Sequence, residues 1–450
     1  MRVCFIPIDN RPVCYNLAID IAAIDKDIEF FIPPREYLGS LTKNAEIDKI
    51  FDWFKNIPEV DKIIISLDTI AYGGLIPSRR SNDTEEVIKK RMLEFRSIWA
   101  KKKAKVLAFS SIMRISNNNY NEEEKEYWKD YGTKIFKYSY DTHKCNLGNL
   151  ASPIQNLIPQ GILNDYLKTR QRNFNINKMY LEWQKLGFFD ELIFSKDDCA
   201  EYGFNVKEAL ELEHAGAKVI TGADEIPISL LSCAIDKELS VLPIFIENES
   251  KHLISNYEDV SIEKSVMNQL ALANVKIDYK NPDIVLVVNN FKNNQGEIVM
   301  KKPTEQFSGE FKLPDKPYMI ADVRNANGAD NNFVKHILPQ IDLKKFYGYS
   351  AWNTSANTLG TLICAAKIKF NSKNYDDNAF KKVQMIRFLD DWAYQANVRQ
   401  MIKQGELPDI REWMLPFENQ VGKLLGIDIN NGYIYPWNRL FEIEVVNESI

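Results

Sequence analysis

Residues 62–69 read KIIISLDT, an apolar run that stops at a polar segment containing Asp68. A short run of β-branched residues bounded in this way is typical of a strand buried on both faces of a parallel sheet. Five other apolar runs also stop at polar motifs, namely VCFIPI, KVLAFS, AKVITG, MIA and FYGYS. Because ligands bind at the carboxyl ends of parallel strands, the polar motifs are predicted to form one site.

The order of the patterns predicts an α/β fold with two Rossmann-like βα lobes. The expected domains are a first α/β lobe at 1–117, a mostly helical insert at 118–215, a second α/β lobe at 216–370 and a helical C-terminal region at 371–450. The insert is expected to begin with a helix at 122–131. An irregular β/α barrel is the alternative, but ten candidate strands exceed the eight of a simple barrel.

Composition excludes several classes of protein. With 45% hydrophobic and 26% charged residues and a net charge of −5, the chain resembles an ordinary soluble protein without a basic field for nucleic acid. No signal sequence or membrane span is visible, so a cytoplasmic protein is expected. Six scattered cysteines and four histidines do not predict a zinc site, and no dinucleotide or Walker motif is present. No organic cofactor is therefore expected.

Two motifs of the first lobe carry candidate site residues. Asp9 and Arg11 follow the first strand, either as a structural pair or as groups that bind a substrate. Asp68 is followed by Tyr72, a ring of the kind that packs on sugars, and by two glycines that let the backbone approach a ligand. A tight turn alone would also explain the glycines.

Further along the chain, Asp197 and Asp198 follow an apolar strand, and Asp224 and Glu225 follow the next one. Adjacent carboxylates can hold a metal, bind sugar hydroxyls or supply an acid with a raised pKa, but they can also cap helices. Trp352 would provide a stacking platform beside two amide side chains. The candidate substrate-binding residues are Asp9, Arg11, Tyr72, Gly73, Gly74, Arg79, Arg114, Asp197, Asp224, Asp322, Arg324, Trp352, Asn353 and Asn357.

Together these motifs resemble those of a bacterial family, domain-of-unknown-function family 4127. The resemblance rests on residues 7–12, 67–79, 197–203, 222–225 and 352–360 and spans the chain to about residue 366. Cys199 stands where relatives are expected to carry threonine, which implies that a hydroxyl is not essential there. The family has no assigned activity, so the resemblance implies a shared site without naming its reaction.

The residues favour a cytoplasmic carbohydrate-active enzyme, most plausibly a glycoside hydrolase, because such enzymes need two carboxylates and an aromatic floor. The expected catalytic residues are Asp68 together with Asp198 or Glu225. Arg11 and Asn353 would then fix a carbohydrate substrate over Tyr72 or Trp352.

Two alternatives remain open. One is a lyase, isomerase or hydrolase of a small anionic metabolite, with Mg²⁺ or Mn²⁺ held by oxygen ligands and the anion held by arginines. The carboxylates considered for this metal are Asp197, Asp198, Asp322 and Asp330, and none is assigned as a ligand. The other alternative is a sugar-binding protein without catalytic activity.

Overall fold

The computed structural model describes residues 1–145, 153–197, 199–403 and 405–447. The chain forms two compact units, each with its own parallel sheet. The first contains Met1–Asn10, Glu29–Pro227 and Tyr257–Asp259, and the second contains Arg11–Ile28, Ile228–Asn256 and Val260–Ile450. The fold class is therefore α/β with two Rossmann-like lobes, and the sheets are open rather than closed into a barrel.

The first unit contains a six-stranded, all-parallel sheet in the order β2-β1-β3-β4-β5-β6. Its strands are β1 (Arg2–Ile6), β2 (Glu29–Phe31), β3 (Lys62–Ser66), β4 (Lys105–Ile112), β5 (Glu191–Lys196) and β6 (Lys218–Thr221). Its helices are α2 (Ile47–Asn56), α3 (Leu67–Tyr72), α4 (Leu75–Arg80), α5 (Glu85–Trp99), α6 (Trp128–Lys144), α7 (Gln160–Lys185) and α8 (Phe204–His214), with 3₁₀ turns at Arg35–Tyr37 and Pro153–Leu157. All five residues of β3 are buried, as expected for a strand covered on both faces.

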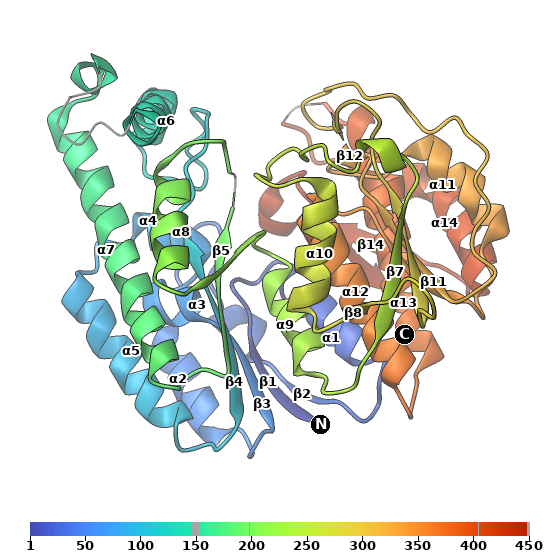
Figure 1. Cartoon of the computed structure of the whole chain (residues 1–450), viewed down its shortest axis with the longest axis horizontal. Coiled ribbons are helices and arrows are strands. Elements are labelled where there is room, and N and C mark those ends of the chain that lie inside the picture. Colours follow the sequence, from blue (N-terminus) through green and yellow to red (C-terminus); the bar gives the residue numbers. More distant parts are fainter. Residues whose placement is uncertain (146–152, 198, 404, 448–450) are drawn as a thin grey trace. The chain divides into compact units, whose positions relative to one another are not determined.

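Helix α5 illustrates how the sequence builds this unit. The Thr84 side chain caps the helix by accepting a hydrogen bond from the backbone of Val87. Buried apolar residues then recur in steps of three or four, at Ile88, Met92, Phe95 and Trp99, and form one face. This face packs against α2 and α7, and α5 and α7 run side by side (Figure 1).

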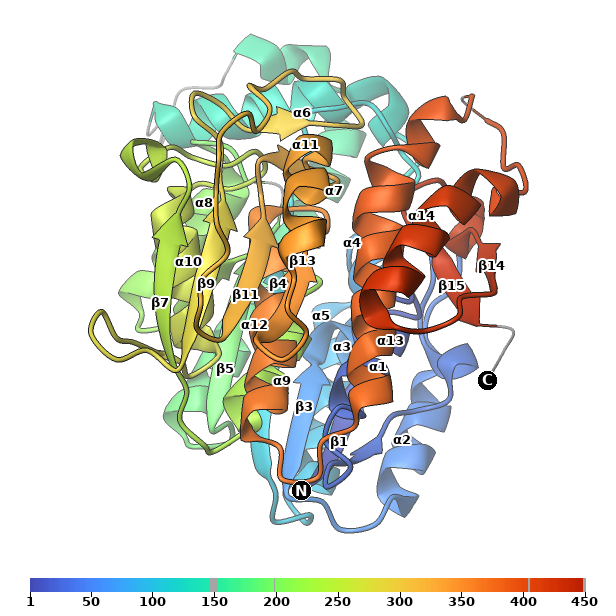
Figure 2. The same cartoon turned by 90° about the vertical axis from the view of Figure 1, so that its right-hand side faces the viewer.

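The second unit contains a five-stranded parallel sheet in the order β13-β11-β9-β7-β8. Its strands are β7 (Ser240–Phe245), β8 (Lys276–Ile277), β9 (Ile284–Asn289), β11 (Tyr318–Asp322) and β13 (Phe346–Ser350), with small pairs β10 (Gly296–Glu297) with β12 (Asn325–Ala326) and β14 (Asn431–Ile434) with β15 (Glu444–Asn447). Figure 2 shows β7, β9, β11 and β13 side by side. In both sheets the second strand of the series lies on one side of the first strand, and the later strands lie on the other side.

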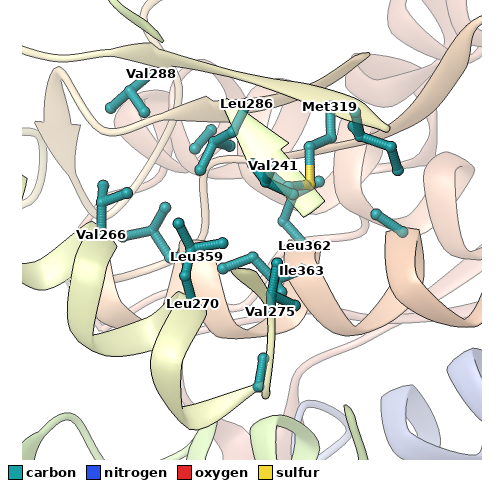
Figure 3. Close-up of a cluster of buried hydrophobic side chains, with 14 of the residues drawn as sticks. Val241, Val266, Leu270, Val275, Leu286, Val288, Met319, Leu359, Leu362 and Ile363 are labelled. Atoms are coloured by element: carbon teal, nitrogen blue, oxygen red, sulfur yellow. The ribbon is translucent and has the colours of Figure 1, made fainter. Parts of the chain in front are cut away.

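Helices of the second unit are α1 (Asn16–Ala22), α10 (Ile262–Leu272), α11 (Asn331–Ile337), α12 (Ser355–Asn371), α13 (Asp377–Arg387) and α14 (Arg411–Leu425). A π-helix (Phe388–Gln395) continues α13, 3₁₀ turns occur at Asn248–Ser250, Leu338–Gln340, Val398–Met401 and Pro436–Asn438, and α9 (Ile226–Ala234) spans the boundary between the units. One core joins α10 and α12 to the sheet through Val266, Leu270, Leu286, Leu359 and Ile363 (Figure 3). None of the helices within the described ranges has the length and hydropathy needed to cross a membrane.

All ten predicted strands are present, although β6, assigned to the second series, pairs with β5 in the first sheet. The prediction of a helix over 122–131 is wrong, because α6 begins only at Trp128. The Arg79 and Arg80 guanidinium groups bind the backbone carbonyls of residues 121–124. These side-chain hydrogen bonds accompany a turn in which the Glu124 N–H donates to the Asn121 carbonyl.

Candidate functional site

Each sheet has a position where the strand order reverses. In the first sheet the chain passes from β1 to β2 on one side and returns to β3 on the other, so the crevice lies between the carboxyl ends of β1 and β3. Ile6 of β1 pairs with Ile65 of β3, and Asp9 and Asp68 each follow the paired residue by three positions. The register therefore brings the backbone of these two residues to the same edge of the first sheet.

Asp68 lies in the first turn of α3 and is 1% exposed. One of its carboxylate oxygens accepts a 2.8 Å hydrogen bond from the backbone N–H of Ser111 in β4, and the Ser111 hydroxyl also donates to the carboxylate. Burial raises the pKa of Asp68 to about 7, although these hydrogen bonds and the positive charge of Arg79 act in the opposite direction. A carboxyl group of this kind exists in both protonation states near neutral pH.

The two glycines after α3, Gly73 and Gly74, pack closely against other backbone segments of this unit. Gly73 has a φ of +92°, and its carbonyl accepts a hydrogen bond from the backbone of Ala45. A Cβ on Gly74, whose φ is +130°, would lie 3.1 Å from the Ile8 carbonyl oxygen. Close backbone packing thus gives both glycines a structural role at this crevice.

Tyr72 is almost fully buried, and the Arg172 guanidinium lies 5.3 Å from its ring centroid. Arg172 is itself fixed by hydrogen bonds to the carbonyls of Ser78, Ser81 and Asp83. A fixed cation therefore faces the ring that the sequence suggested as a sugar platform.

A cluster of arginines and carboxylates lies beyond β4 and β5. Arg79 and Arg114 share the carboxylates of Glu123 and Glu124, and Arg114 also lies 3.7 Å from Asp197. The Arg79 side chain is 1% exposed, and its Nη2 has no hydrogen-bond partner among the residues that the structure describes. The structure therefore brings Arg79, Arg114 and Asp197 together, as a mutually neutralising group.

Glu225 lies beyond β6, where Gly222 leaves room for its side chain. A Cβ on Gly222 would lie only 1.8 Å from Glu225 Oε1, and Glu225 Oε2 accepts a 3.0 Å hydrogen bond from the backbone of Ala223. Burial, together with the negative charges of Asp224 and Glu258, raises the pKa of Glu225 to about 8. Asp198, the other carboxylate expected to pair with Asp68, lies outside the described residues.

Between these groups, Lys196 at the end of β5 pairs with the Asp259 carboxylate, which also accepts a 2.6 Å hydrogen bond from Thr221. The sequence motifs gave no role to Lys196, Ser111 or Asp259. Lys196 and Ser111 could have been found, because both lie at the carboxyl ends of apolar strands. Asp259 lies on a segment that returns to the first unit from the second, which local sequence does not reveal.

In the second sheet the strand order reverses between β7 and β9. Arg324 lies at this position with a fully buried side chain, and Glu247 beyond β7 pairs with it at 2.8 Å. Its remaining guanidinium nitrogens bind the Asn289 side chain and the Glu305 carbonyl, and Asp330 lies 3.3 Å away. Every nitrogen of this guanidinium is therefore used within the unit.

Asp322 belongs to the same network. One of its oxygens accepts a hydrogen bond from the Asn289 amide, and the other accepts from the Asp330 backbone and the Tyr349 hydroxyl. Burial, together with the negative charge of Asp330, raises the pKa of Asp322 to about 8. Asp322 thus resembles Asp68 in its raised pKa, and it accepts its hydrogen bonds from three other residues.

The loop after β13 contains Trp352, Asn353 and Asn357. Trp352 is 2% exposed, and its carbonyl accepts a hydrogen bond from the Thr358 hydroxyl. Asn353 adopts a φ of +57°, and its carbonyl accepts a hydrogen bond from the backbone of Asn327. The backbone N–H of Asn357 donates to the Thr354 side chain, which caps α12. These residues lie together within the second unit and are largely buried there.

Arg11 also belongs to the second unit, whereas Asp9 belongs to the first. The Arg11 guanidinium lies 5.2 Å from the ring centroid of Trp437 and contacts the Cys14 sulfur. The candidate residues are therefore divided into two groups, one in each unit. Asp9, Asp68, Arg79, Arg114, Asp197, Asp224 and Glu225 belong to the first group, and Arg11, Asp322, Arg324, Trp352, Asn353 and Asn357 belong to the second.

The described ranges contain no group of three or more His, Cys, Asp and Glu side chains arranged to hold a metal. Asp322 already accepts donors on both oxygens, and Asp197 faces Arg114. The chemistry that the first group can perform is proton transfer, because it contains buried carboxyl groups with pKa values near neutrality.

The chain belongs to a family described as a protein of unknown function (DUF4127), whose model matches residues 3–423. The family resemblance predicted from the motifs is thereby confirmed. No curated protein matches the chain, and no solved structure matches it. The match covers the sheets of both units and ends within α14.

Proposed function

We propose that this protein is a carbohydrate-active enzyme, most specifically a glycoside hydrolase, whose catalytic carboxylates lie at the carboxyl edge of the first sheet. The observation that carries the proposal is Asp68, which is fully buried at the reversal of strand order and has a pKa near 7. A carboxyl group that retains its proton near neutrality can protonate the oxygen of a leaving group.

Strand spacing helps to select the second carboxylate. Neighbouring strands lie about 4.8 Å apart, so Asp9 follows a strand one spacing from β3, whereas Glu225 follows a strand three spacings away, roughly 14 Å. The two carboxyl groups of a glycosidase are about 5–9.5 Å apart. Spacing therefore favours Asp9 as the partner of Asp68. Glu225 is proposed to bind the substrate.

In the proposed reaction Asp68 donates its proton to the glycosidic oxygen while the bond to the anomeric carbon breaks. The Asp9 carboxylate stabilises the positive charge that develops on the sugar ring, on the ring side opposite the leaving group. Ser111 holds Asp68 in place through its backbone N–H. Water then adds its oxygen to the anomeric carbon and gives a proton back to the Asp68 carboxylate, which restores the acid.

The test is turnover of a panel of 4-nitrophenyl glycosides by wild type, Asp68→Asn and Asp322→Asn. We expect wild type to release nitrophenol from at least one glycoside, Asp68→Asn to release it more slowly, and folded Asp322→Asn to retain activity. Asp322 is the matched control because it is also buried at a strand end and also has a raised pKa. Equal activity of wild type and Asp68→Asn would remove the proposed role.

One observation favours a second candidate, an enzyme that acts on a small anionic metabolite. Arg79 Nη2 is buried and has no hydrogen-bond partner within the described part of the chain, and a guanidinium nitrogen in this state can bind a carboxylate or phosphate oxygen. Turnover of sugar phosphates, with no turnover of neutral glycosides, would favour this candidate.

A further inference from the structure

The first unit contains a cavity of about 620 Å³ that is separate from the carboxylates of the candidate site. Residues 81–86 before and at the start of α5 line one side, and the middle of α7 lines the other, together with Lys125. Its volume falls within the range of roughly 300–1,000 Å³ typical of small-ligand sites. All of its lining residues are polar or charged. Each lining side chain can therefore offer a hydrogen-bonding group to a ligand.

Most of the charged groups around the cavity are already paired. Lys125 binds both carboxylate oxygens of Asp165 and the Thr169 hydroxyl, and Tyr127 donates to the same carboxylate. Arg172 is held by backbone carbonyls. These bonds give the cavity a fixed wall with little uncompensated charge. Such a wall suits a neutral ligand better than an anion or a cation.

The start of α5 further disfavours an anion. Helix N-termini attract negative charge, but here Glu85 and Glu86 occupy the first turn and Thr84 already caps it. Glu85 in turn pairs with Lys89 and accepts a hydrogen bond from Asn175. A hydroxyl group of a ligand can both donate and accept a hydrogen bond. It therefore matches the amide, hydroxyl and carboxylate groups that line the cavity.

The cavity is also close to the candidate site along both of its sides. Ser81 directly follows Arg79 and Arg80, and Lys125 directly follows Glu124, whose carboxylate binds Arg79 and Arg114. A chain-like ligand held in the cavity can therefore extend toward the arginine cluster that adjoins Asp68.

From the cavity, we infer that the first unit has a second binding site for neutral hydroxyl-rich ligands, a distal subsite for a sugar unit of the substrate. This inference rests on the proposed glycoside hydrolase activity for the identity of the ligand. Gln171 and Asn175 bind the sugar hydroxyls from α7, and Asn82 and Lys168 bind them from the rim.

Helix α7 offers a matched control. Gln171 donates to Asn175 at 2.9 Å within the cavity, and Gln160 makes the same contact with Asn164 at 2.7 Å on an exposed part of the helix outside it. The double variants Gln171→Ala/Asn175→Ala and Gln160→Ala/Asn164→Ala thus remove the same groups from the same helix. Asn82→Ala, a change at an exposed lining residue, provides a second test if the cavity variant fails to fold.

The experiment measures binding of cellotriose, maltotriose and tri-N-acetylchitotriose by calorimetry, with Asp68→Asn as the background so that no substrate is consumed. We expect at least one trisaccharide to bind, and the cavity variant to bind it about tenfold more weakly, since two neutral hydrogen bonds are lost. The Gln160→Ala/Asn164→Ala control should bind like its parent.

Absence of binding by all three trisaccharides overturns the inference, as does equal weakening in the two double variants or preferential binding of inorganic phosphate. The outcomes also separate the two proposals. Binding that depends on the cavity, without any glycoside turnover by wild type, would leave the subsite in place and remove the hydrolase. Turnover of nitrophenyl glycosides without trisaccharide binding would do the reverse.

Discussion

The two units share a strand order but differ in the hydrogen bonds made to a buried aspartate at the carboxyl edge of the sheet. In each sheet the second strand lies on one side of the first and all later strands lie on the other, so both have an equivalent crevice. In the second unit, Asp322 and Arg324 form a network that uses both carboxylate oxygens and every guanidinium nitrogen. In the first unit, Asp68 accepts hydrogen bonds from the backbone N–H and hydroxyl of Ser111 and from its own backbone N–H.

The comparison shows that a raised pKa does not by itself identify a catalytic group. Asp322 and Asp68 both have pKa values raised by burial, to about 8 and about 7. The origin of the donors separates them. Asp322 accepts hydrogen bonds from three other residues, and a carboxyl group tied to several segments in this way stabilises the fold. Substitutions at the edge of the second sheet should therefore lower stability, and those at the edge of the first sheet should lower activity.

The largest effect is expected for Asp9→Asn. Loss of the partner carboxylate should lower kcat by roughly 10²–10⁴-fold, with little change in KM. Glu225→Gln is the comparison and should lower kcat less, because Glu225 follows a more distant strand. Steady-state kinetics on the best nitrophenyl glycoside measures both. A larger loss for Glu225→Gln would assign the partner role to that residue.

Asp322→Asn should act on stability. Both oxygens of Asp322 accept hydrogen bonds, whereas the amide of asparagine has an NH₂ group in place of one oxygen. This NH₂ group must face one of the donors, which costs roughly 1–3 kcal/mol. Urea unfolding should show a lower midpoint, while activity per folded molecule stays near that of wild type. Lost activity in a variant with unchanged stability would place Asp322 in the catalytic group.

Asp68→Asn should show a stability difference that depends on pH. The pKa of Asp68 is raised from 3.8 to about 7 in the folded protein, so the folded state binds a proton more tightly than the unfolded state. Wild type therefore loses stability as pH rises from about 4 to about 7, whereas the asparagine variant does not titrate. The Tm of the variant relative to wild type should increase across this window. The exposed control Asp52→Asn should show no such trend, and a flat difference for Asp68→Asn would contradict burial of the charge.

The smallest effect is expected for Ser111→Ala, which removes a hydroxyl donor and keeps the backbone N–H. The hydroxyl stabilises the Asp68 carboxylate, so its loss should raise the pKa of Asp68 and move the alkaline limb of kcat/KM to higher pH. Ser110→Ala is the control, since that hydroxyl donates to Asn177. A limb that moves equally in both variants would show that the shift does not come from Asp68.

Local sequence predicted the strands and the edges at which polar groups gather. The strands are short apolar runs whose character does not depend on their neighbours, and β3 and β9 are clear examples. The same rule could have found Asn289, which ends β9, and Glu247, which lies just beyond β7. Neither residue stands in a dense polar motif of the kind that marks the other strand ends.

The partners of each group could not be predicted, because they depend on contacts between distant segments. Glu247 pairs with Arg324 across 77 positions of sequence. Asp391 lies in a π-helix and accepts a hydrogen bond from Ala351 at the end of β13, which sequence periodicity does not reveal. Sequence also gave Tyr72 and the glycine pair a role toward a ligand, whereas in the structure they contact Arg172 and the backbone.

The central claim is that Asp68 is the general acid, and a series of aryl glycosides with different leaving groups tests it most directly. A 2,4-dinitrophenyl group leaves without protonation, whereas a phenyl group needs a proton from the enzyme. We predict that Asp68→Asn loses roughly 10²-fold or more in kcat/KM on the phenyl glycoside and retains most activity on the dinitrophenyl glycoside. An equal loss on both substrates would contradict the account.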